Sequence, residues 1–127
     1  KVVHALQQAH PYETVAYGLT VLENVQSDLG MGCIGQLTKP IAEQEFLAEL
    51  KAILGTPMLR HSALLGKKIE RVALLGGSGS FAIDAAKGQN ADVFITADLK
   101  YHDFYKGENR ILLIDAGHYE SEQFTKK

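Results

Sequence analysis

The chain has 127 residues, of which 46% are hydrophobic and 22% are charged, and its net charge at pH 7 is −2. This composition is typical of a globular domain and excludes a disordered chain. The near balance of charge argues against general nucleic-acid binding and against an anionic membrane surface, because both need clustered positive charge. The single cysteine, Cys33, excludes an intrachain disulfide framework, and we expect it to be a small buried residue. No apolar run is long enough to span a membrane.

The first 30 residues predict a helix, a strand and a domain boundary. Apolar side chains recur with helical spacing over residues 2–9, and His10-Pro11 ends the helix because the residue before a proline avoids the α region. Residues 15–22 alternate larger apolar residues with smaller or polar ones, which predicts a strand. The polar, turn-prone residues 24–30 are the best boundary candidate in the chain.

A strand and an amphipathic helix are predicted next. Residues 31–37 form a short apolar stretch, and Thr38-Lys39-Pro40 gives a helix start signal with proline near the first helical position. Apolar residues with helical spacing continue to Leu54, and Gly55 ends the helix.

The remaining residues alternate strands with helices. Further strands are predicted over residues 58–63, 69–75, 92–96 and 111–114, and helices over residues 81–87, 99–107 and 118–127. Short apolar strands that alternate with helices indicate an α/β fold with a mixed, partly parallel sheet.

Two glycine patterns are candidate phosphate loops. Residues 30–35 match GxGxxG, but the glycines lead into a strand rather than a helix, so we interpret them as a turn at a strand entry. Residues 76–80, GGSGS, lie between a predicted strand and a predicted helix. The amides of Gly77, Ser78, Gly79 and Ser80 could hold an anion, but a glycine turn into a helix can equally be architecture.

A stronger signal follows the last two predicted parallel strands. Asp98 and His102 come after the strand at residues 92–96, and His118 and Glu122 come after the strand at residues 111–114. In open α/β sheets, ligands bind beyond the carboxyl ends of the strands. His118 and Glu122 are four residues apart, which puts both side chains on one helix face within reach of one cation.

Nitrogen and oxygen ligands of this kind suit zinc, iron, manganese or cobalt. We also expect the helix N-terminus to keep the His118 imidazole neutral. Asp98 and His102 are candidates for completing the ligand set or for acid–base catalysis beside it. The alternative is that His118 caps the helix and that Glu122 is solvated. His61, on a predicted strand, is expected to be a packed or surface residue.

Three blocks of the sequence resemble the NGG-interacting-factor-three-like dinuclear metal-centre family, the GTP cyclohydrolase I type 2 homologues. The blocks are residues 76–80 (GGSGS), 91–102 (ADVFITADLKYH) and 115–122 (DAGHYESE), in the family's order and spacing. Ala97 stands where the family usually has glycine. His10-Pro11-Tyr12-Glu13 and the glycines of residues 30–35 resemble the end of the PII/CutA-like insert of longer members.

The resemblance implies a metal site with two ions in a cleft between two similar halves. It assigns His118 and Glu122 as ligands, and it places the remaining ligands in an amino-terminal half that this chain does not contain. It also implies a cytoplasmic homo-oligomer, a hexamer in the intact protein. Three roles are compatible with the resemblance. The first is metal binding, and the second is a metal-dependent hydrolase or cyclohydrolase acting on a nucleotide-like or phosphorylated substrate. The third is a non-catalytic interaction or metallochaperone role.

The resemblance also changes the expected domain organisation. Residues 1–30 are interpreted as the remnant of a partial ferredoxin-like insert, and residues 31–127 as the carboxyl-terminal half of the metal-centre domain. Because the chain opens on Lys1 rather than methionine, we expect a fragment or processed product that is inactive alone.

Overall fold

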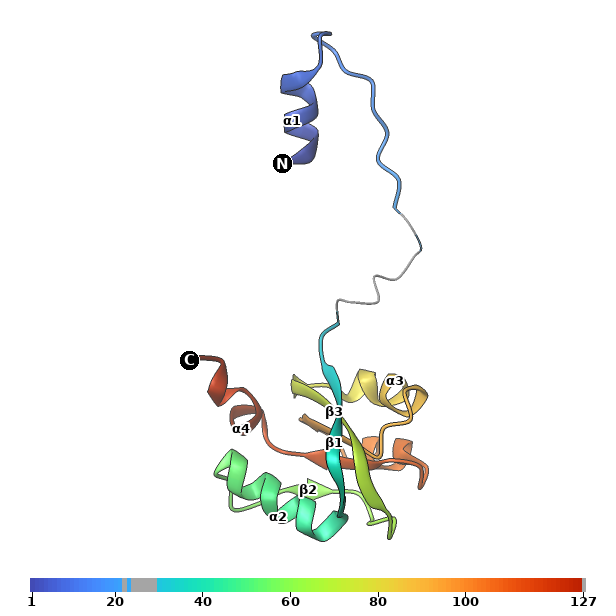
Figure 1. The fold of residues 1–127 in the computed structure, drawn as a ribbon, viewed down its shortest axis with the longest axis vertical. Coiled ribbons are helices and arrows are strands. Elements are labelled where there is room, and N and C mark those ends of the chain that lie inside the picture. Colours follow the sequence, from blue (N-terminus) through green and yellow to red (C-terminus); the bar gives the residue numbers. More distant parts are fainter. Residues whose placement is uncertain (22, 24–29, 127) are drawn as a thin grey trace.

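The computed structural model describes residues 1–21, 23 and 30–126. Its core is a five-stranded sheet in the order β1-β3-β4-β5-β2 (Figure 1). The strands are β1 (Cys33–Ala42), β2 (Arg60–His61), β3 (Lys68–Ser78), β4 (Val93–Ala97) and β5 (Leu112–Asp115). The strands β3, β4 and β5 are parallel, whereas β1 and β2 run antiparallel to their neighbours at the two edges. The sheet is therefore mixed and partly parallel, as the sequence predicts.

Two helices, α2 (Glu43–Leu54) and α3 (Ile83–Gly88), cover opposite faces of this sheet (Figure 1). The helices are α1 (Val2–Ala9), α2 (Glu43–Leu54), α3 (Ile83–Gly88) and α4 (His118–Glu122), with short 3₁₀ turns at Ser80–Ala82, Asp103–Gly107 and Gln123–Lys126. Phe46 and Leu50 of α2 pack on one face of the sheet, and Ile83 and Ala86 of α3 pack on the other. No described helix is long and apolar enough to cross a membrane.

The central strands are buried on both faces. Val93 and Ile95 belong to the cluster under α2, while Phe94 between them belongs to the cluster under α3. Leu112, Leu113 and Ile114 of β5 alternate between the two clusters in the same way, and none of the three is exposed to solvent. Continuous apolar runs such as VFI and LLI are what a parallel sheet covered on both sides requires.

The sequence places the start of α2 wrongly. Thr38-Lys39-Pro40 is not a helix start, because β1 continues through Ala42 and the helix begins at Glu43. Pro40 lies in an edge strand, within the stretch where the pairing of β1 with β3 shifts between Gln36 and Ile41. Proline lacks an N–H, so edge strands and bulges are the places in a sheet that tolerate it. The helix ends at Gly55, whose φ of 64° is the left-handed cap expected there.

Two further expectations for local structure are corrected. The strand β3 continues beyond Leu75 through Ser78, so three of the five GGSGS residues belong to the strand. The helix predicted over residues 99–107 is reduced to the 3₁₀ turn Asp103–Gly107. The Asp103 carboxylate accepts a hydrogen bond from the Lys100 amide at 2.9 Å, and such side-chain bonds compete with a regular helix.

The amino-terminal segment lies apart from the sheet (Figure 1). The helix α1 forms over residues 2–9 as predicted, but it buries no residue. The strand predicted over residues 15–22 is wrong for residues 15–21, which form neither strand nor helix; Leu22 lies outside the described residues, as do residues 24–29 of the predicted boundary. A strand needs a hydrogen-bonded neighbour, and alternation alone does not supply one.

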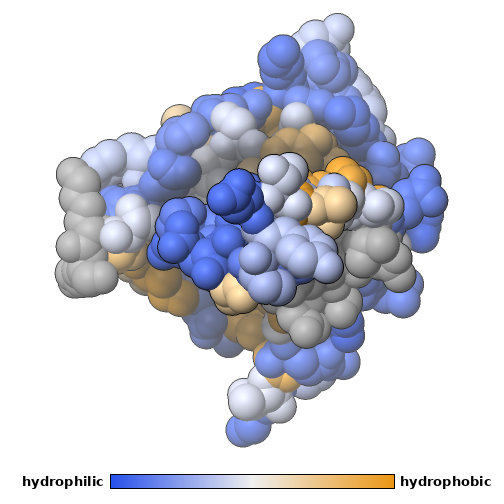
Figure 2. Space-filling view, turned by 90° about the horizontal axis from the view of Figure 1, so that it is seen from above, coloured by the Kyte–Doolittle hydropathy of each residue, from blue (hydrophilic) through white to orange (hydrophobic). Residues whose placement is uncertain are grey.

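The amino-terminal segment and the residues just before β1 carry some of the exposed apolar side chains. Leu19 and Val21 are more than four-fifths exposed, and Met31 is 79% exposed. Cys33, which we expect to be buried, is exposed because β1 lies at the sheet edge. Seen from above, the visible face is largely hydrophilic and hydrophobic residues show as separate patches (Figure 2).

Candidate metal centre

Polar side chains meet where the parallel strands end. Because β3, β4 and β5 are parallel neighbours, their carboxyl ends reach the same edge of the sheet. Ser78 ends β3, Asp98 follows β4, and His118 begins α4 three residues after the end of β5. These three segments are far apart in the sequence, and the side chains of Ser78 and His118 both contact Asp98.

The His118 imidazole lies between two carboxylates. Its Nδ1 is 2.7 Å from Asp98 Oδ2, and its Nε2 is 3.4 Å from Glu122 Oε2. His118 and Glu122 are one helical turn apart in α4, so their proximity follows from the sequence spacing. The three side chains are about half exposed, which leaves this cluster open to solvent.

Asp98 is the central residue of a hydrogen-bonded chain. The Ser78 hydroxyl donates to the Asp98 carboxylate, which also accepts from His118 Nδ1. The backbone of Asp98 is in the left-handed region, with φ of 56°, where aspartate is better tolerated than most residues. The Ser78 hydroxyl, followed by the His118 imidazole, holds the pKa of the Asp98 carboxyl below its usual range.

The surroundings of His118 shift its pKa in the direction opposite to the sequence-based expectation. The Asp98 carboxylate raises the pKa of His118 above its usual value, and Glu122 adds to this effect. Both carboxylates favour the charged form of the imidazole, which acts against the neutral form expected from the helix N-terminus. A metal ion at Nε2 would therefore compete with a proton.

The glycines of residues 76–80 bring α4 close to the end of β3. The Gly77 amide donates to Ser121 Oγ at 3.1 Å, and Thr96 Oγ1 donates to the Gly77 carbonyl at 2.9 Å. A Cβ at Gly77 would lie 2.6 Å from Glu122 Oε1, and φ there is 66°. Glycine at position 77 thus satisfies the backbone conformation and makes room for the Glu122 carboxylate.

One of the four amides predicted to hold an anion is already engaged, because the Gly77 amide donates to Ser121 Oγ. The Ser78 hydroxyl beside it donates to Asp98. The carboxylates of Asp98 and Glu122 lie beside them and would repel an anion. Anion binding by the remaining predicted amides, those of Ser78, Gly79 and Ser80, stays a prediction.

The other histidines fall outside this cluster. His102 is 54% exposed, lies with Nε2 3.8 Å from Asp103 Oδ1 and packs edge-to-face on Tyr101. Among the described contacts, none brings His102 to Asp98 or His118. His61 is exposed on the edge strand β2, with Nδ1 2.7 Å from the Ser62 carbonyl, in keeping with the expected surface role.

No group of three or more His, Cys, Asp or Glu side chains within the described residues is arranged to hold a metal ion. The geometry explains this, because Asp98 and Glu122 contact opposite nitrogens of the ring and so do not converge on one point. The pair that can share an ion is His118 Nε2 with the Glu122 carboxylate.

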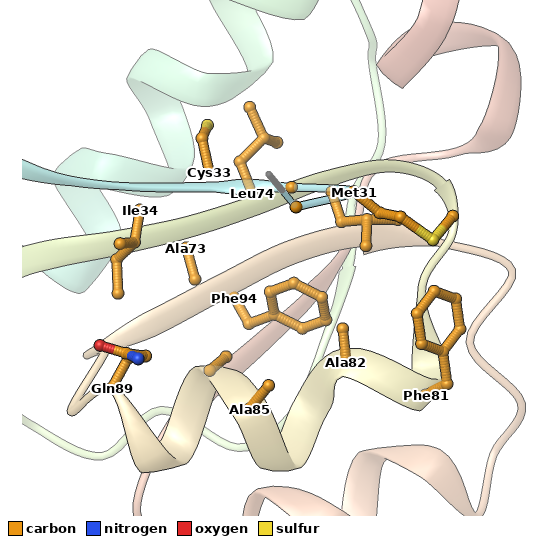
Figure 3. A pocket seen from close by; sticks show the side chains of 14 residues that line it. Met31, Cys33, Ile34, Ala73, Leu74, Phe81, Ala82, Ala85, Gln89 and Phe94 are labelled. Carbon is orange, nitrogen blue, oxygen red and sulfur yellow. The ribbon is translucent and has the colours of Figure 1, made fainter. Parts of the chain in front are cut away.

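A separate groove of about 550 Å³ lies between β1 and α3 and is lined by apolar side chains (Figure 3). Met31 and Phe81 lie at one end and Gln89 at the other (Figure 3). None of its lining residues belongs to the Asp98, His118 and Glu122 cluster. The candidate metal centre is therefore an open polar surface and not part of this groove.

Sequence reasoning missed two residues that support the cluster. Ser121 ties α4 to Gly77, and Arg60 of β2 pairs with the buried Asp115 at 3.1 Å. Ser121 lies three residues after His118, on the neighbouring turn, and this spacing could have predicted that it lies near the cluster. Nothing in the spacing of Arg60 and Asp115, 55 residues apart, could have paired them.

Comparison with known proteins extends this description. A family model described as Duf34/NIF3 (NGG1p interacting factor 3) matches residues 4–127. A curated Staphylococcus aureus protein named GTP cyclohydrolase 1 type 2 homolog is 36% identical over 124 residues, which cover 96% of this chain and 33% of that protein. A Halalkalibacterium halodurans protein of the same name is 39% identical over 102 residues, which cover 80% of this chain and 27% of that protein.

Solved structures show the same similarity. The structure of a Bacillus cereus protein related to NIF3 matches with a TM-score of 0.74 and 34% identity over 98% of this chain and 35% of that chain. Reduced HcgD from Methanocaldococcus jannaschii matches with a TM-score of 0.60 and 26% identity over 75% of this chain. The chain spans about a third of the length of the curated relatives it matches.

Proposed function

The chain belongs to the Duf34/NIF3 family, and on this premise we propose that it binds a divalent metal ion through His118 and Glu122. The observation that carries the proposal is the 3.4 Å separation of His118 Nε2 and Glu122 Oε2. Zinc lies about 2.0–2.2 Å from nitrogen and oxygen ligands, so two ligands at a tetrahedral angle are about 3.4 Å apart. The observed separation therefore supports the proposal that the two side chains share one ion.

The surroundings of the pair support this assignment. Asp98 accepts from Nδ1 of His118, and such a carboxylate orients a ligating imidazole and leaves Nε2 for the metal. Ser78 in turn donates to Asp98. Asp98 is thus proposed as the residue that orients His118, rather than as a ligand or a general base.

The pair supplies only part of a site. Zinc sites have three or four protein ligands, and this chain offers two in suitable geometry among its described residues. We propose that the remaining ligands come from the part of the longer protein that this chain lacks. A site with two ions in the intact subunit, filled by zinc, iron, manganese or cobalt, remains the proposal that the family resemblance supports.

The domain boundary near residue 30 is also carried forward as a proposal. It is supported by α1, which buries no residue, and by residues 15–21, which form neither strand nor helix. Residues 1–30 would then belong to a PII/CutA-like module. A cytoplasmic homo-oligomer, hexameric in the intact protein, is proposed from the family resemblance.

A metal-dependent hydrolase or cyclohydrolase is the second candidate function of the intact protein. It is favoured by the name of the curated relatives, GTP cyclohydrolase 1 type 2 homolog. A bound divalent ion would supply Lewis acidity and lower the pKa of bound water. In this chain Asp98 would hold the His118 ring, while a role for His102 rests only on its place after β4. If the intact protein bound metal but lacked hydrolase activity, a metallochaperone or interaction role would be favoured.

Isothermal titration of this chain with Zn²⁺ tests the proposal. We expect weak binding that His118→Ala abolishes, because half of the available ligand pair is lost. His61→Ala is the matched control, since it removes an exposed imidazole outside the cluster and should leave binding unchanged. Tight stoichiometric binding that survives His118→Ala would contradict the ligand assignment.

A further inference from the structure

Asp115 is a buried carboxylate at the end of β5, and its side chain is 6% exposed. Its Oδ2 accepts hydrogen bonds from the Leu99 amide and from Arg60 Nη1, each at 3.1 Å. Its Oδ1 accepts from the Gly117 amide, also at 3.1 Å. One side chain therefore joins β2 to the two loops that follow β4 and β5.

These two loops carry the residues of the cluster. Leu99 directly follows Asp98, and Gly117 directly precedes His118. Arg60 strengthens the connection, because its Nη2 donates to the Leu99 carbonyl at 3.1 Å. Asp115 thus holds the backbone one residue away from each partner of the Asp98–His118 hydrogen bond.

The local backbone explains why such support is needed. Asp98 has φ of 56° and Gly117 has φ of 87°, so both loops turn through the left-handed region, which only glycine adopts readily. Hydrogen bonds donated to a buried acceptor offset the cost of that conformation, and bonds to a charged group are stronger than those to a neutral one.

We infer that Asp115 is a positioning residue of the proposed metal centre, which sets the distance between Asp98 and His118 by holding both loops through one carboxylate. This inference rests on the proposed function, since it concerns the same site. A carboxylate is required because both of its oxygens accept hydrogen bonds. The amide of asparagine offers one accepting oxygen, so Asp115→Asn can keep the contacts of only one oxygen.

Asp103 provides a matched control. Its side chain is 4% exposed, and it accepts from the Lys100 amide at 2.9 Å and from Lys106 Nζ at 2.6 Å. Both donors lie within three residues of Asp103, and neither belongs to the loop that carries His118. Asp103→Asn therefore removes a buried charge of the same kind without touching Gly117 or Leu99.

Amide hydrogen exchange of the metal-free chain tests the positioning itself. In Asp115→Asn we expect the amides of Leu99, Gly117 or both to exchange about tenfold faster, as the loss of a bond to a charged acceptor implies. In Asp103→Asn both amides should exchange as in the wild type. Unchanged exchange at Leu99 and Gly117 in Asp115→Asn would overturn the inference.

Zn²⁺ affinity tests the link to the metal centre. We expect Asp115→Asn to weaken Zn²⁺ binding by about tenfold or more, as is typical for residues that orient ligands, and Asp103→Asn to leave it unchanged. An equal loss in both variants would mean that general destabilisation is responsible and would overturn the inference. A wild-type chain that takes up no Zn²⁺ overturns the proposed function instead, while the exchange rates still decide whether Asp115 holds the loops.

Arg60→Met serves if Asp115→Asn does not fold. Arg60 is half exposed, and its replacement removes the bonds to Asp115 Oδ2 and to the Leu99 carbonyl while sparing Oδ1. We expect the Leu99 amide to exchange faster and the Gly117 amide to keep its protection. Faster exchange at both amides, or unchanged exchange at both, would overturn the inference.

Discussion

The amino-terminal segment, residues 1–21, and the sheet region, residues 33–126, differ in what holds their secondary structure. The helix α1 has an amphipathic pattern but buries nothing, whereas α2 and α3 each bury apolar residues against the sheet. Short helices are marginal in water by themselves and gain most of their stability from packing. A pattern therefore shows which face of an element is apolar, and a packed partner decides whether that face stabilises the fold.

The largest expected difference in unfolding free energy between the two regions comes from truncating one apolar residue in each. Ile114→Ala removes a side chain with no exposure to solvent from the cluster under α2, and should cost about 2–5 kcal/mol of unfolding free energy. Leu6→Ala on α1 should change it by less than about 0.5 kcal/mol. Urea unfolding of both variants measures the difference, and a comparable loss in Leu6→Ala would mean that α1 packs on the sheet region.

Glycine substitutions sharpen the same comparison. A Cβ at Gly79 would collide with Thr96 Oγ1 and lie 2.8 Å from Leu75 Cδ2, whereas a Cβ at Gly18 meets nothing within 4 Å. We expect Gly79→Ala to cost about 1–3 kcal/mol through overpacking, and Gly18→Ala to leave stability unchanged. Thermal unfolding of the two variants checks this, and an unaltered midpoint for Gly79→Ala would show that the β3–α3 turn can shift without cost.

The pH dependence of stability should arise in the sheet region. Lys106 and the Lys100 amide hold the pKa of the Asp103 carboxyl below its usual range. Because the folded pKa is lower than that of the unfolded chain, about 3.9, the carboxylate stabilises the fold above that value and loses this effect as the pH falls. Asp103→Asn should therefore flatten the fall in melting temperature below about pH 5. An identical pH profile for the variant and the wild type would rule out this contribution.

The smallest effect is expected from removing the amino-terminal segment. A chain that begins at Gly30 should unfold within about 0.5 kcal/mol of the full chain, because α1 contributes no buried residue. Chemical denaturation of the two chains provides the comparison. A shortened chain that is clearly less stable would show that the first residues stabilise the sheet.

Sequence patterns predicted the α/β fold where burial decides the structure. The apolar runs at residues 93–95 and 112–114 identify strands covered on both faces, and Gly55 marks the end of α2. Sequence patterns gave wrong predictions where the secondary structure depends on pairing with another strand. Pro40 was a helix start signal in sequence but sits in an edge strand, and residues 15–21 lack the neighbour that alternation alone cannot supply.

The candidate metal centre was predictable in part for the same reason. The pairing of His118 with Glu122 follows from helical spacing, and Asp98 follows from its place at the end of a parallel strand. That Asp98 would contact Nδ1 and raise the pKa of His118 depends on how two loops are held, which spacing does not specify. Asp115 and Arg60 act through contacts between residues far apart in the sequence.

Paramagnetic line broadening by Mn²⁺ tests the central claim most directly, because it locates the ion on the chain. The proposed metal centre predicts that the resonances of His118, Glu122 and the adjacent Gly77 amide broaden first as Mn²⁺ is added. His118→Ala should abolish this pattern. Broadening centred instead on His4 and His10 of the amino-terminal segment, or on His61, would contradict the assignment of His118 and Glu122 as the metal-binding pair.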